Sequence, residues 1–259
     1  PVVLDALFGT GLDRQLEAGL AQQLTQVRQQ AGFVLAADVP SGVGTDNGAD
    51  FGAIKADVTI ALGALKPAHL LYPAAGLCGH IICADIGIAA HSGLSVVARP
   101  RLAQPTAADH KYTRGMVVVV AGDMGGAAAL AATAAARSGA GYVVLAGAQS
   151  GPLVQTPLSI VHRTLDAALA DPRTRAIVIG PGLGRKDASR AMLERALATH
   201  VPLVLDADAL HLMTPDQLRH RTAPCVLTPH EGEFQAAFGM LSGSKIDRAR
   251  QAAKLSGAT

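Results

Sequence analysis

The feature that most constrains the fold is a repeated pattern in which a short apolar segment runs directly into a glycine-rich or polar turn. In the first half, residues 2–4 lead into Asp5–Gly11, and residues 33–37 lead into Asp38–Gly42. The second half repeats the pattern at residues 117–126, 177–184, 203–210 and 225–234. In open α/β sheets, ligands bind just beyond the carboxyl ends of the strands. The pattern therefore predicts two nucleotide-handling α/β domains in series.

Helices and strands can be placed between these turns from apolar periodicity. In the first half we expect strands at 1–4, 33–37, 57–62 and 80–84 and a helix at 16–30. In the second half we expect strands at 116–121, 142–146, 176–179, 203–205 and 225–227, and helices at 127–137, 188–199 and 245–255. Residues 98–106 contain two prolines and little periodicity, which indicates a linker. We therefore expect one domain over residues 1–97, a linker over 98–109 and a second domain over 110–259.

Composition narrows the class of partner. Basic residues number 22 and acidic residues 20, and this net charge of +2 is too small to indicate nucleic acid. The chain has no Trp, which disfavours base-stacking platforms, and no apolar run long enough to span a bilayer. The three cysteines, an odd number without CxxC spacing, are typical of buried reduced thiols in a cytoplasmic protein. We expect a small phosphorylated molecule as the partner, with no nucleic acid and no membrane.

Asp5 and Asp38 are the carboxylates best placed for chemistry in the first domain, because both follow predicted strands. If those strands are adjacent, both carboxylates face one crevice, beside the amides of Gly9–Gly11 and the hydroxyl of Ser41. Such a pair can perform acid–base work, or can bind a cation together with hydroxyl and carbonyl oxygens. The alternative is that both aspartates only satisfy the backbone of their turns.

The second domain offers three candidate segments. Gly122–Gly126 precedes Ala127 at a predicted helix start and resembles an anion cradle, although tight turns often need glycine in any case. Gly180–Gly184 has three glycines at alternate positions, which permits very close backbone approach to a ligand. Thr228–Glu233 places polar side chains at a strand end, with His230 free to donate or accept a hydrogen bond.

Taken in order, these segments resemble the bifunctional NAD(P)H-hydrate repair enzymes, in which an epimerase domain is fused to an ADP- or ATP-dependent dehydratase domain. On the epimerase side the matching segments are Asp5–Leu12, Asp38–Gly42, Lys55–Thr59 and Asp85–Ile88. On the dehydratase side they are His110-Lys111, Gly122–Leu130, Gly139–Gly141, Gly180–Gly184, Asp206–Leu210 and Thr228–Phe234. The resemblance covers essentially the whole chain.

The resemblance implies a partial Rossmann-like epimerase domain followed by a partial ribokinase-like domain. It implies that Asp5 and Ser41 help to hold K+, and that Asp5 and Asp38 are catalytic. The residues implied to contact the hydrated nicotinamide nucleotide are Gly9, Thr10, Gly11, Leu12, Asp13, Arg14, Gln15 and Asp38. In the dehydratase, Ala127, Gly184 and His230 are implied to line the substrate side of the cleft.

The implied function is nicotinamide nucleotide repair. The R and S forms of NADHX or NADPHX are interconverted, and the S form is dehydrated to NADH or NADPH at the expense of ADP or ATP. The ring hydroxyl is phosphorylated and phosphate is then eliminated, because phosphate is a better leaving group than hydroxide. K+ and Mg2+ accompany the nucleotide, and a homo-oligomer is expected because such α/β enzymes are often assemblies.

Two departures from the family pattern accompany the resemblance. The family's upstream Asn-Asn-Gly-Gly-Asp-Gly loop and its downstream Gly-x-Gly-Asp helix start have no match in these 259 residues. We therefore expect a fragment that is truncated at both ends and impaired in both activities. Two alternatives stay open: a ribokinase-like small-molecule kinase, which shares the second domain, and a non-catalytic nucleotide-binding module.

Overall fold

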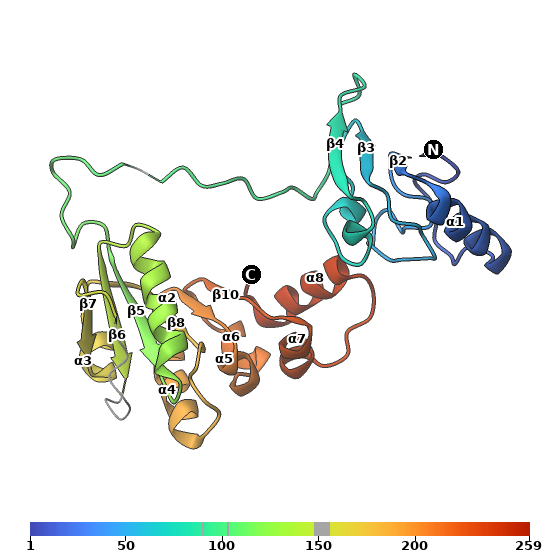
Figure 1. The fold of residues 1–259 in the computed structure, drawn as a ribbon. Helices are drawn as coiled ribbons and strands as arrows, with labels where there is room; N and C mark the ends of the chain where they lie inside the picture. Colours follow the sequence, from blue (N-terminus) through green and yellow to red (C-terminus); the bar gives the residue numbers. More distant parts are fainter. Residues whose placement is uncertain (90, 103, 148–155) are drawn as a thin grey trace. The chain divides into compact units, whose positions relative to one another are not determined.

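The computed structural model describes residues 1–89, 91–102, 104–147 and 156–259 (Figure 1). Ala103, within the expected linker, lies outside the described residues. The chain forms two compact units, the first over residues 1–98 and 244–246 and the second over residues 99–243 and 247–259. Each unit is built on its own parallel sheet, so the predicted α/β class is confirmed.

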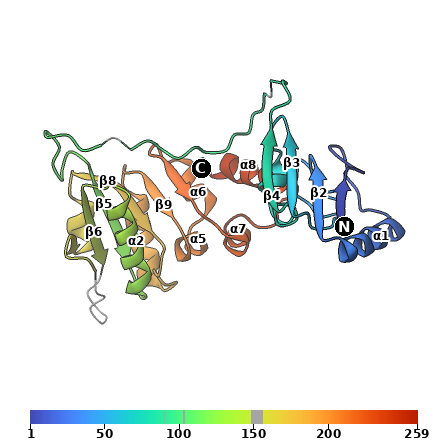
Figure 2. The ribbon, with the colours of Figure 1, turned by 45° about the horizontal axis from the view of Figure 1, so that its top comes forward.

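The first unit contains a four-stranded sheet in the order β1-β2-β3-β4, and every neighbouring pair is parallel (Figure 2). The strands are β1 (Val2–Asp5), β2 (Phe33–Ala37), β3 (Val58–Leu62) and β4 (His80–Ala84). Helix α1 (Ala18–Gln30) connects β1 to β2, and the short 3-10 turns η1 (Pro67–His69) and η2 (Ala74–Gly76) connect β3 to β4.

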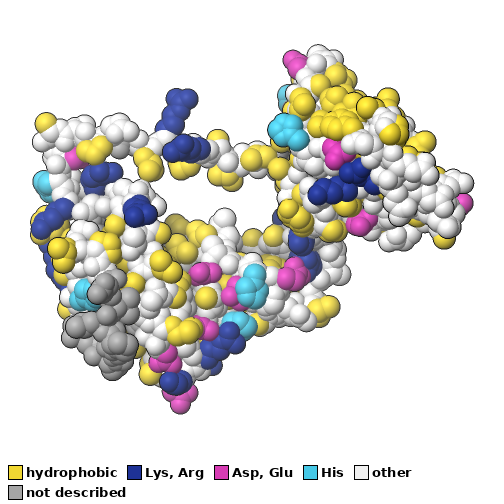
Figure 3. Space-filling model, in the orientation of Figure 1, with side chains coloured by type: hydrophobic (Ala, Val, Ile, Leu, Met, Phe, Trp, Pro, Cys, Tyr) yellow, Lys and Arg dark blue, Asp and Glu magenta, His cyan; other side chains and the backbone are white. Residues whose placement is uncertain are grey.

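Only one face of this sheet has a core among the described residues. Val34 and Ala36 are fully buried there, packed against Leu24 of α1. Right-handed crossovers between strands in sequential order all fall on the same side of a sheet, which explains the one-sided cover. We call the other face the open face; its exposed apolar side chains are Val2, Leu4, Phe33, Leu62 and Ile82. Hydrophobic side chains gather over the strands of this unit in Figure 3.

The second unit contains a six-stranded sheet in the order β10-β9-β8-β5-β6-β7, again with every pair parallel. The strands are β5 (Met116–Ala121), β6 (Tyr142–Gly147), β7 (Ile160–Arg163), β8 (Thr174–Ile179), β9 (Leu203–Leu205) and β10 (Cys225–Leu227). The direction of strand addition reverses between β5 and β8. A reversal of this kind opens a crevice at the carboxyl ends of the strands.

Helices cover both faces of the second sheet, as parallel sheets require. The helices are α2 (Gly125–Arg137), α3 (Leu165–Leu169), α4 (Asp187–Leu197), α5 (Asp208–Leu212), α6 (Pro215–Arg219), α7 (Glu231–Phe238) and α8 (Lys245–Ser256). The small side chains of Ala128 and Ala132 allow α2 to pack directly on Val119. On the other face, Val118 belongs to a cluster with Leu165 of α3 and Leu193 of α4.

Two further expectations can be compared with the structure. Cys78 and Cys225 are buried, and burial raises the pKa of each thiol to about 11. The expectation of buried thiols is wrong for Cys83, which is exposed because β4 is an edge strand. Within the described part of the chain, none of the helices has the length and apolar character needed to cross a membrane.

Candidate functional site

Asp5 lies at the end of β1 and is nearly buried, with 4% of its surface exposed. Its Oδ2 accepts a hydrogen bond of 2.8 Å from the backbone N–H of Ser41. The hydroxyl of Ser41 in turn accepts a hydrogen bond of 2.9 Å from the backbone N–H of Phe8. These bonds join the ends of β1 and β2, which are adjacent as the prediction required.

The second carboxylate oxygen of Asp5 fits a cation. Asp5 Oδ1 is buried and has no hydrogen-bond partner among the described residues. A buried oxygen without a donor is costly, and a bound cation would remove that cost. Carboxylate and hydroxyl oxygens are ligands of hard cations, and the Ser41 hydroxyl stands beside this carboxylate. Asp5 and Ser41 therefore fit part of a K+ site. The described residues contain no group of three or more His, Cys, Asp or Glu side chains able to hold a metal.

Asp38 follows β2 in a left-handed backbone conformation, with φ of 67°. Aspartate tolerates this conformation better than most residues, because its short polar side chain bonds locally. Here Oδ1 accepts a hydrogen bond of 3.0 Å from the backbone N–H of Leu62 and an ion-pair contact from the Lys66 ammonium. The same ammonium donates to the carbonyl of Leu62 at 2.7 Å. The side chains of Asp38 and Lys66 are only 17% and 18% exposed.

His69 supports the same arrangement from η1. Its Nε2 donates to the carbonyl of Asp38 at 2.7 Å, and its Nδ1 accepts from the backbone N–H of Lys66 at 2.9 Å. These two bonds require the neutral ring with its proton on Nε2. Burial lowers the pKa of His69, and the bond to the Asp38 carbonyl opposes this only in part. His69 therefore stays neutral and acts as a fixed brace for the Asp38 backbone.

Lys66 and His69 were not among the residues expected from the sequence. The signal that could have found them is Lys66-Pro67-Ala68-His69, which begins four residues after the third predicted strand.

Asp5 and Asp38 lie at adjacent strand ends, but their hydrogen bonds direct them to different partners, Ser41 and Lys66. Near them, the expected substrate turn Gly9–Gln15 is exposed except for the half-buried Leu12.

In the second unit, the loops after β5, β8 and β9 pack against one another through their glycines. A Cβ on Gly180 would lie 1.7 Å from the carbonyl oxygen of Asp206. A Cβ on Gly122 would lie 2.1 Å from the carbonyl oxygen of Leu183, and one on Gly182 would lie 2.3 Å from that of Met124. Contact between these loops therefore requires glycine at these three positions. The close approach of the Gly180–Gly184 backbone to a ligand stays a prediction.

Gly184 and Asp208 connect two of these loops. The backbone N–H of Gly184 donates to Asp208 Oδ2 at 3.0 Å, and Arg185 Nε donates to Oδ1 at 2.7 Å. Burial acts to raise the pKa of Asp208, but the bonds from Arg185 and Gly184 bring it below its ordinary value. The Gly184 N–H is thus already satisfied within the protein, so Gly184 can contribute shape to a ligand site but no free donor.

His230 is the N-cap of α7 rather than a residue with two free ring nitrogens. Its Nδ1 accepts from the backbone N–H groups of Gly232 at 3.0 Å and Glu233 at 3.2 Å. Its Nε2 lies 3.2 Å from Glu233 Oε1. The expectation that His230 is free to donate or accept is therefore wrong for Nδ1, because the helix start uses that nitrogen. The side chain is still 71% exposed at the loop edge.

Two other features mark this edge. Ala127 is half-buried in the first turn of α2, and its N–H donates to the carbonyl of Met124 at 3.2 Å. Ala207 has φ of 47°, a strained conformation for alanine, directly after Asp206. The Asp206 carboxylate accepts a bond of 2.8 Å from the Thr228 hydroxyl. Strained residues of this kind cluster at functional sites. Residues from the ends of β5, β8, β9 and β10 thus meet at one edge of the sheet.

Both units match known protein families. Residues 117–259 match the family model described as NAD(P)H-hydrate dehydratase. Residues 1–68 match the family model described as the YjeF-related protein N-terminus. The first of these models covers more than half of the chain, and its matched range contains all the loops of the second candidate edge. The second matched range contains Asp5, Ser41, Asp38 and Lys66.

Two curated relatives are similar over nearly the whole chain. The bifunctional NAD(P)H-hydrate repair enzyme of Mycobacterium tuberculosis is 37% identical over 270 residues, which cover 100% of this chain and 56% of the relative. The enzyme of the same name from Coxiella burnetii is 35% identical over 268 residues, covering 96% and 54%. The chain therefore spans about half the length of the curated relatives it matches.

A solved structure supports the fold of the second unit. A ribokinase-like superfamily protein from Enterococcus faecalis aligns with a TM-score of 0.52 and 24% sequence identity, over 60% of this chain and 60% of that one. At this identity the likeness concerns the fold alone. The expected ribokinase-like architecture is confirmed.

Proposed function

Because the chain belongs to the NAD(P)H-hydrate dehydratase family, we propose that it takes part in the repair of hydrated nicotinamide nucleotides. Residues 110–259 contribute to dehydration, and residues 1–97 contribute to interconversion of the R and S epimers of NADHX or NADPHX. One observation carries the proposal: each unit holds a polar cluster at the carboxyl edge of its sheet, within the range matched by its family model.

In the first unit, Asp38 is the acid–base group of the proposed epimerase. Its carboxylate is held by Lys66 and by the backbone N–H of Leu62, so its direction is fixed before substrate binds. The exposed turn from Gly9 to Gln15 and Asp38 contact the nucleotide. Asp5 and Ser41 hold K+, which supplies positive charge next to the substrate phosphates when bound. Asp5 thus contributes to epimerisation indirectly, because the K+ that it holds positions the phosphates of the bound nucleotide.

In the second unit, the proposed reaction transfers phosphate from ADP or ATP to the ring hydroxyl of the hydrate. The phosphate then leaves with the C–O bond electrons while the ring nitrogen lone pair forms an iminium. Loss of a proton from the neighbouring ring carbon to the departing phosphate or to water then forms the C=C double bond of NADH or NADPH. Ala127, Gly184 and His230 line the substrate side of the crevice. Mg2+ arrives on the nucleotide phosphates, as is usual for this ion. Backbone amides at such an edge stabilise charge on the transferring group.

The test uses chemically hydrated NADH and the full-length protein that carries this chain, with K+, Mg2+ and either ADP or ATP. Nucleotide-dependent recovery of NADH absorbance is expected, and consumption of both epimers is expected from the first unit. No recovery, together with phosphorylation of another alcohol, would instead establish a ribokinase-like kinase. Nucleotide binding without any turnover would establish a non-catalytic module.

His230→Ala separates the two proposed activities. The change removes an exposed ring and one helix cap, so we expect weaker substrate binding in dehydration and unchanged epimerisation. The homo-oligomer and the cytoplasmic location belong to the same proposal. The first rests on the frequency of assemblies among such α/β enzymes, and the second rests on the three cysteines without CxxC spacing. Light scattering of the purified protein and cell fractionation test them directly.

A further inference from the structure

We propose that the amino-terminal edge of the second sheet carries a binding site for phosphate-type oxyanions. The site is formed by Lys111, Tyr112, Arg163 and Arg173, and we call it the rear cluster. Tyr142 begins β6 and Thr174 begins β8 at this edge. Arg163 is the last residue of β7, but its side chain bonds to the Tyr142 hydroxyl and to Asp171, which precedes β8. The loops of the candidate site instead follow the carboxyl ends of β5, β8, β9 and β10. The rear cluster is thus separate from the proposed catalytic edge.

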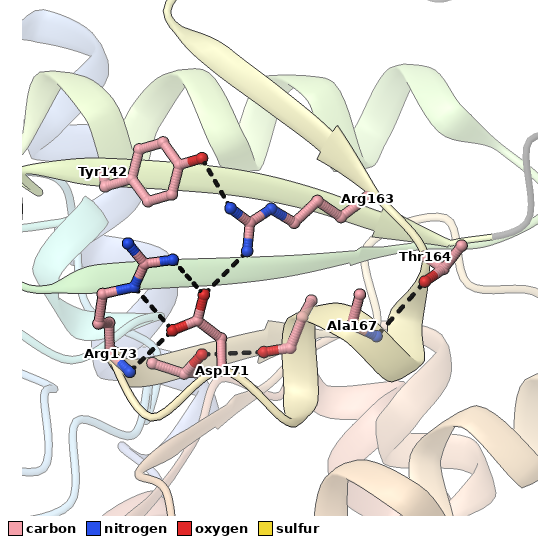
Figure 4. Close-up of polar contacts among 8 residues, drawn as sticks. Tyr142, Arg163, Thr164, Ala167, Asp171 and Arg173 are labelled. Carbon is pink, nitrogen blue, oxygen red and sulfur yellow. Dashed lines mark hydrogen bonds and ion pairs between the residues drawn. The ribbon is translucent and has the colours of Figure 1, made fainter.

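A single carboxylate organises the two arginines of the rear cluster (Figure 4). Asp171, whose side chain is 7% exposed, accepts from Arg173 Nε at 2.8 Å and Nη2 at 2.6 Å. It also accepts from Arg163 Nη1 at 2.9 Å. Arg163 Nη2 donates to the hydroxyl of Tyr142 at 3.2 Å. Both guanidinium groups are therefore held in fixed orientations around one nearly buried carboxylate.

Two tyrosine rings hold the third cation, Lys111, in the same place. Its ammonium lies 4.9 Å from the ring centroid of Tyr112 and 5.7 Å from that of Tyr142. Arg173 lies 4.6 Å from the Tyr112 centroid, and the two rings meet edge to face. Because cations already lie over both rings, stacking of a nucleobase is disfavoured. The groups left for recognition are the N–H donors and the positive charge.

The rear cluster has more positive charge than its own carboxylate neutralises. Lys111 forms no ion pair among the described residues, and Arg163 and Arg173 share the one carboxylate of Asp171. The pKa of Tyr112 is lowered, chiefly by a hydrogen bond from Lys111. The positive charges around Tyr112 thus already favour a negatively charged oxygen at the position of its hydroxyl. Arginine forks and lysine ammonium groups are the usual phosphate ligands of proteins.

Tyrosine fluorescence offers a local probe, because the chain has no Trp and only three tyrosines, two of them in this region. Tyr72→Phe leaves Tyr112 and Tyr142 as the only reporters. The protein is titrated with inorganic phosphate and, separately, with AMP as a phosphate ester, against sodium chloride at equal ionic strength. A saturable change with phosphate alone identifies free phosphate as the ligand, whereas a tighter response to AMP identifies a phosphorylated metabolite.

Lys111→Gln should weaken this binding about tenfold, because it removes one hydrogen bond to a charged group. The matched control is Lys254→Gln, which changes an exposed lysine on α8 and should leave the affinity unchanged. Arg173→Lys keeps the positive charge but loses the paired N–H donors of the guanidinium group. It provides a second variant if Lys111→Gln alters the circular dichroism spectrum. Absence of a saturable response to both anions would overturn the proposal. So would equal weakening by Lys111→Gln and the control.

Discussion

Lys66 and Asp38 form an ion pair that joins the carboxyl ends of two neighbouring strands in the first unit. The pair is mostly shielded from water, and the Lys66 ammonium is also bonded to the Leu62 carbonyl. A lysine with two fixed acceptors has little freedom of its own. The position of the Asp38 carboxylate is therefore set by a residue in the segment that follows the next strand.

Lys66→Met should lower kcat for epimerisation by roughly tenfold or more, the usual effect of losing a hydrogen bond to a charged group. Lys66→Arg should recover part of this rate, because it restores a donor and a charge. Epimer interconversion in the full-length protein gives the measurement, with nucleotide-dependent dehydration as the internal control. A changed circular dichroism spectrum together with lost epimerisation would show that the first unit has simply lost its fold. An equal decrease in kcat for both activities would contradict the assignment of epimerisation to the first unit.

Asp38→Asn and Asp38→Ala should separate chemistry from backbone conformation. Both changes remove the carboxylate, so both should abolish epimerisation and leave dehydration intact. Asparagine tolerates φ of 67°, whereas alanine there is destabilised by roughly 1–2 kcal/mol. Urea unfolding of the two variants measures this difference. Equal stability would mean that the left-handed conformation is not retained.

His69 should make the stability of the first unit depend on pH. Burial holds its folded pKa below 6.5, its ordinary value and the one expected in the unfolded chain. Between the folded pKa and 6.5, the unfolded chain binds more protons than the folded chain. The free energy of unfolding should therefore decrease as the pH falls below 6.5.

The control for this prediction is His69→Asn, which should remove that part of the pH dependence while keeping an acceptor near the Lys66 N–H. Tyr72 is the one tyrosine of the first unit, so its fluorescence in a Tyr112→Phe, Tyr142→Phe background reports unfolding of that unit. An unchanged pH profile in His69→Asn would assign the effect to another group.

Two glycine substitutions in the second unit should have opposite effects. Gly180→Ala would place its Cβ against the Asp206 carbonyl at φ of 129°, so we expect a loss of roughly 2–5 kcal/mol. Gly126→Ala adds a Cβ with nothing within 4 Å in a helical turn, so we expect a gain of up to about 1 kcal/mol. Thermal unfolding measures both. A neutral Gly180→Ala would show that the two loops are not in contact.

Substitutions at two valines on opposite faces of the first sheet test whether the open face is exposed to solvent. Val34→Thr buries a hydroxyl without a partner and should cost about 1–3 kcal/mol. Val2→Thr, at a residue that is 75% exposed, should change stability by no more than about 0.5 kcal/mol. Binding of an apolar dye should decrease in Val2→Thr but not disappear. A large cost for Val2→Thr would mean that this face is covered in solution.

The strands were the most predictable part of the fold. The expected bounds match the structure at Phe33–Ala37, His80–Ala84, Met116–Ala121, Leu203–Leu205 and Cys225–Leu227. These segments are apolar runs closed by polar or glycine residues, so local chemistry defines both ends. By contrast, β7 has the sequence Ile-Val-His-Arg and was missed, because half of its residues are polar at the sheet edge. Strand order depends on contacts between distant residues and was not predictable.

The candidate site was predictable only in part, for a similar reason. Asp5, Ser41 and Asp38 stand at strand ends, where a pattern of apolar and polar residues can find them. Lys66 and His69 act through a neighbouring strand, so their role follows from the pairing of β2 with β3. His230 follows a predicted strand, but its helix-capping bonds depend on backbone geometry that the sequence pattern does not give. Sequence patterns thus located the strand ends that carry the candidate site residues. The hydrogen-bond partners of those residues could be identified only from the way the strands pair in the structure.

The order of strands in the two sheets has a consequence for synthesis on the ribosome. In the first unit each new strand pairs with the one made just before it, so the sheet can grow at a single edge as the chain emerges. In the second unit β5 pairs with β6 on one side, but its other side waits for β8. That unpaired edge of β5 is a potential site for aberrant strand pairing until Ile179 has been translated. The crevice of the proposed dehydratase thus cannot form before β8 has paired with β5.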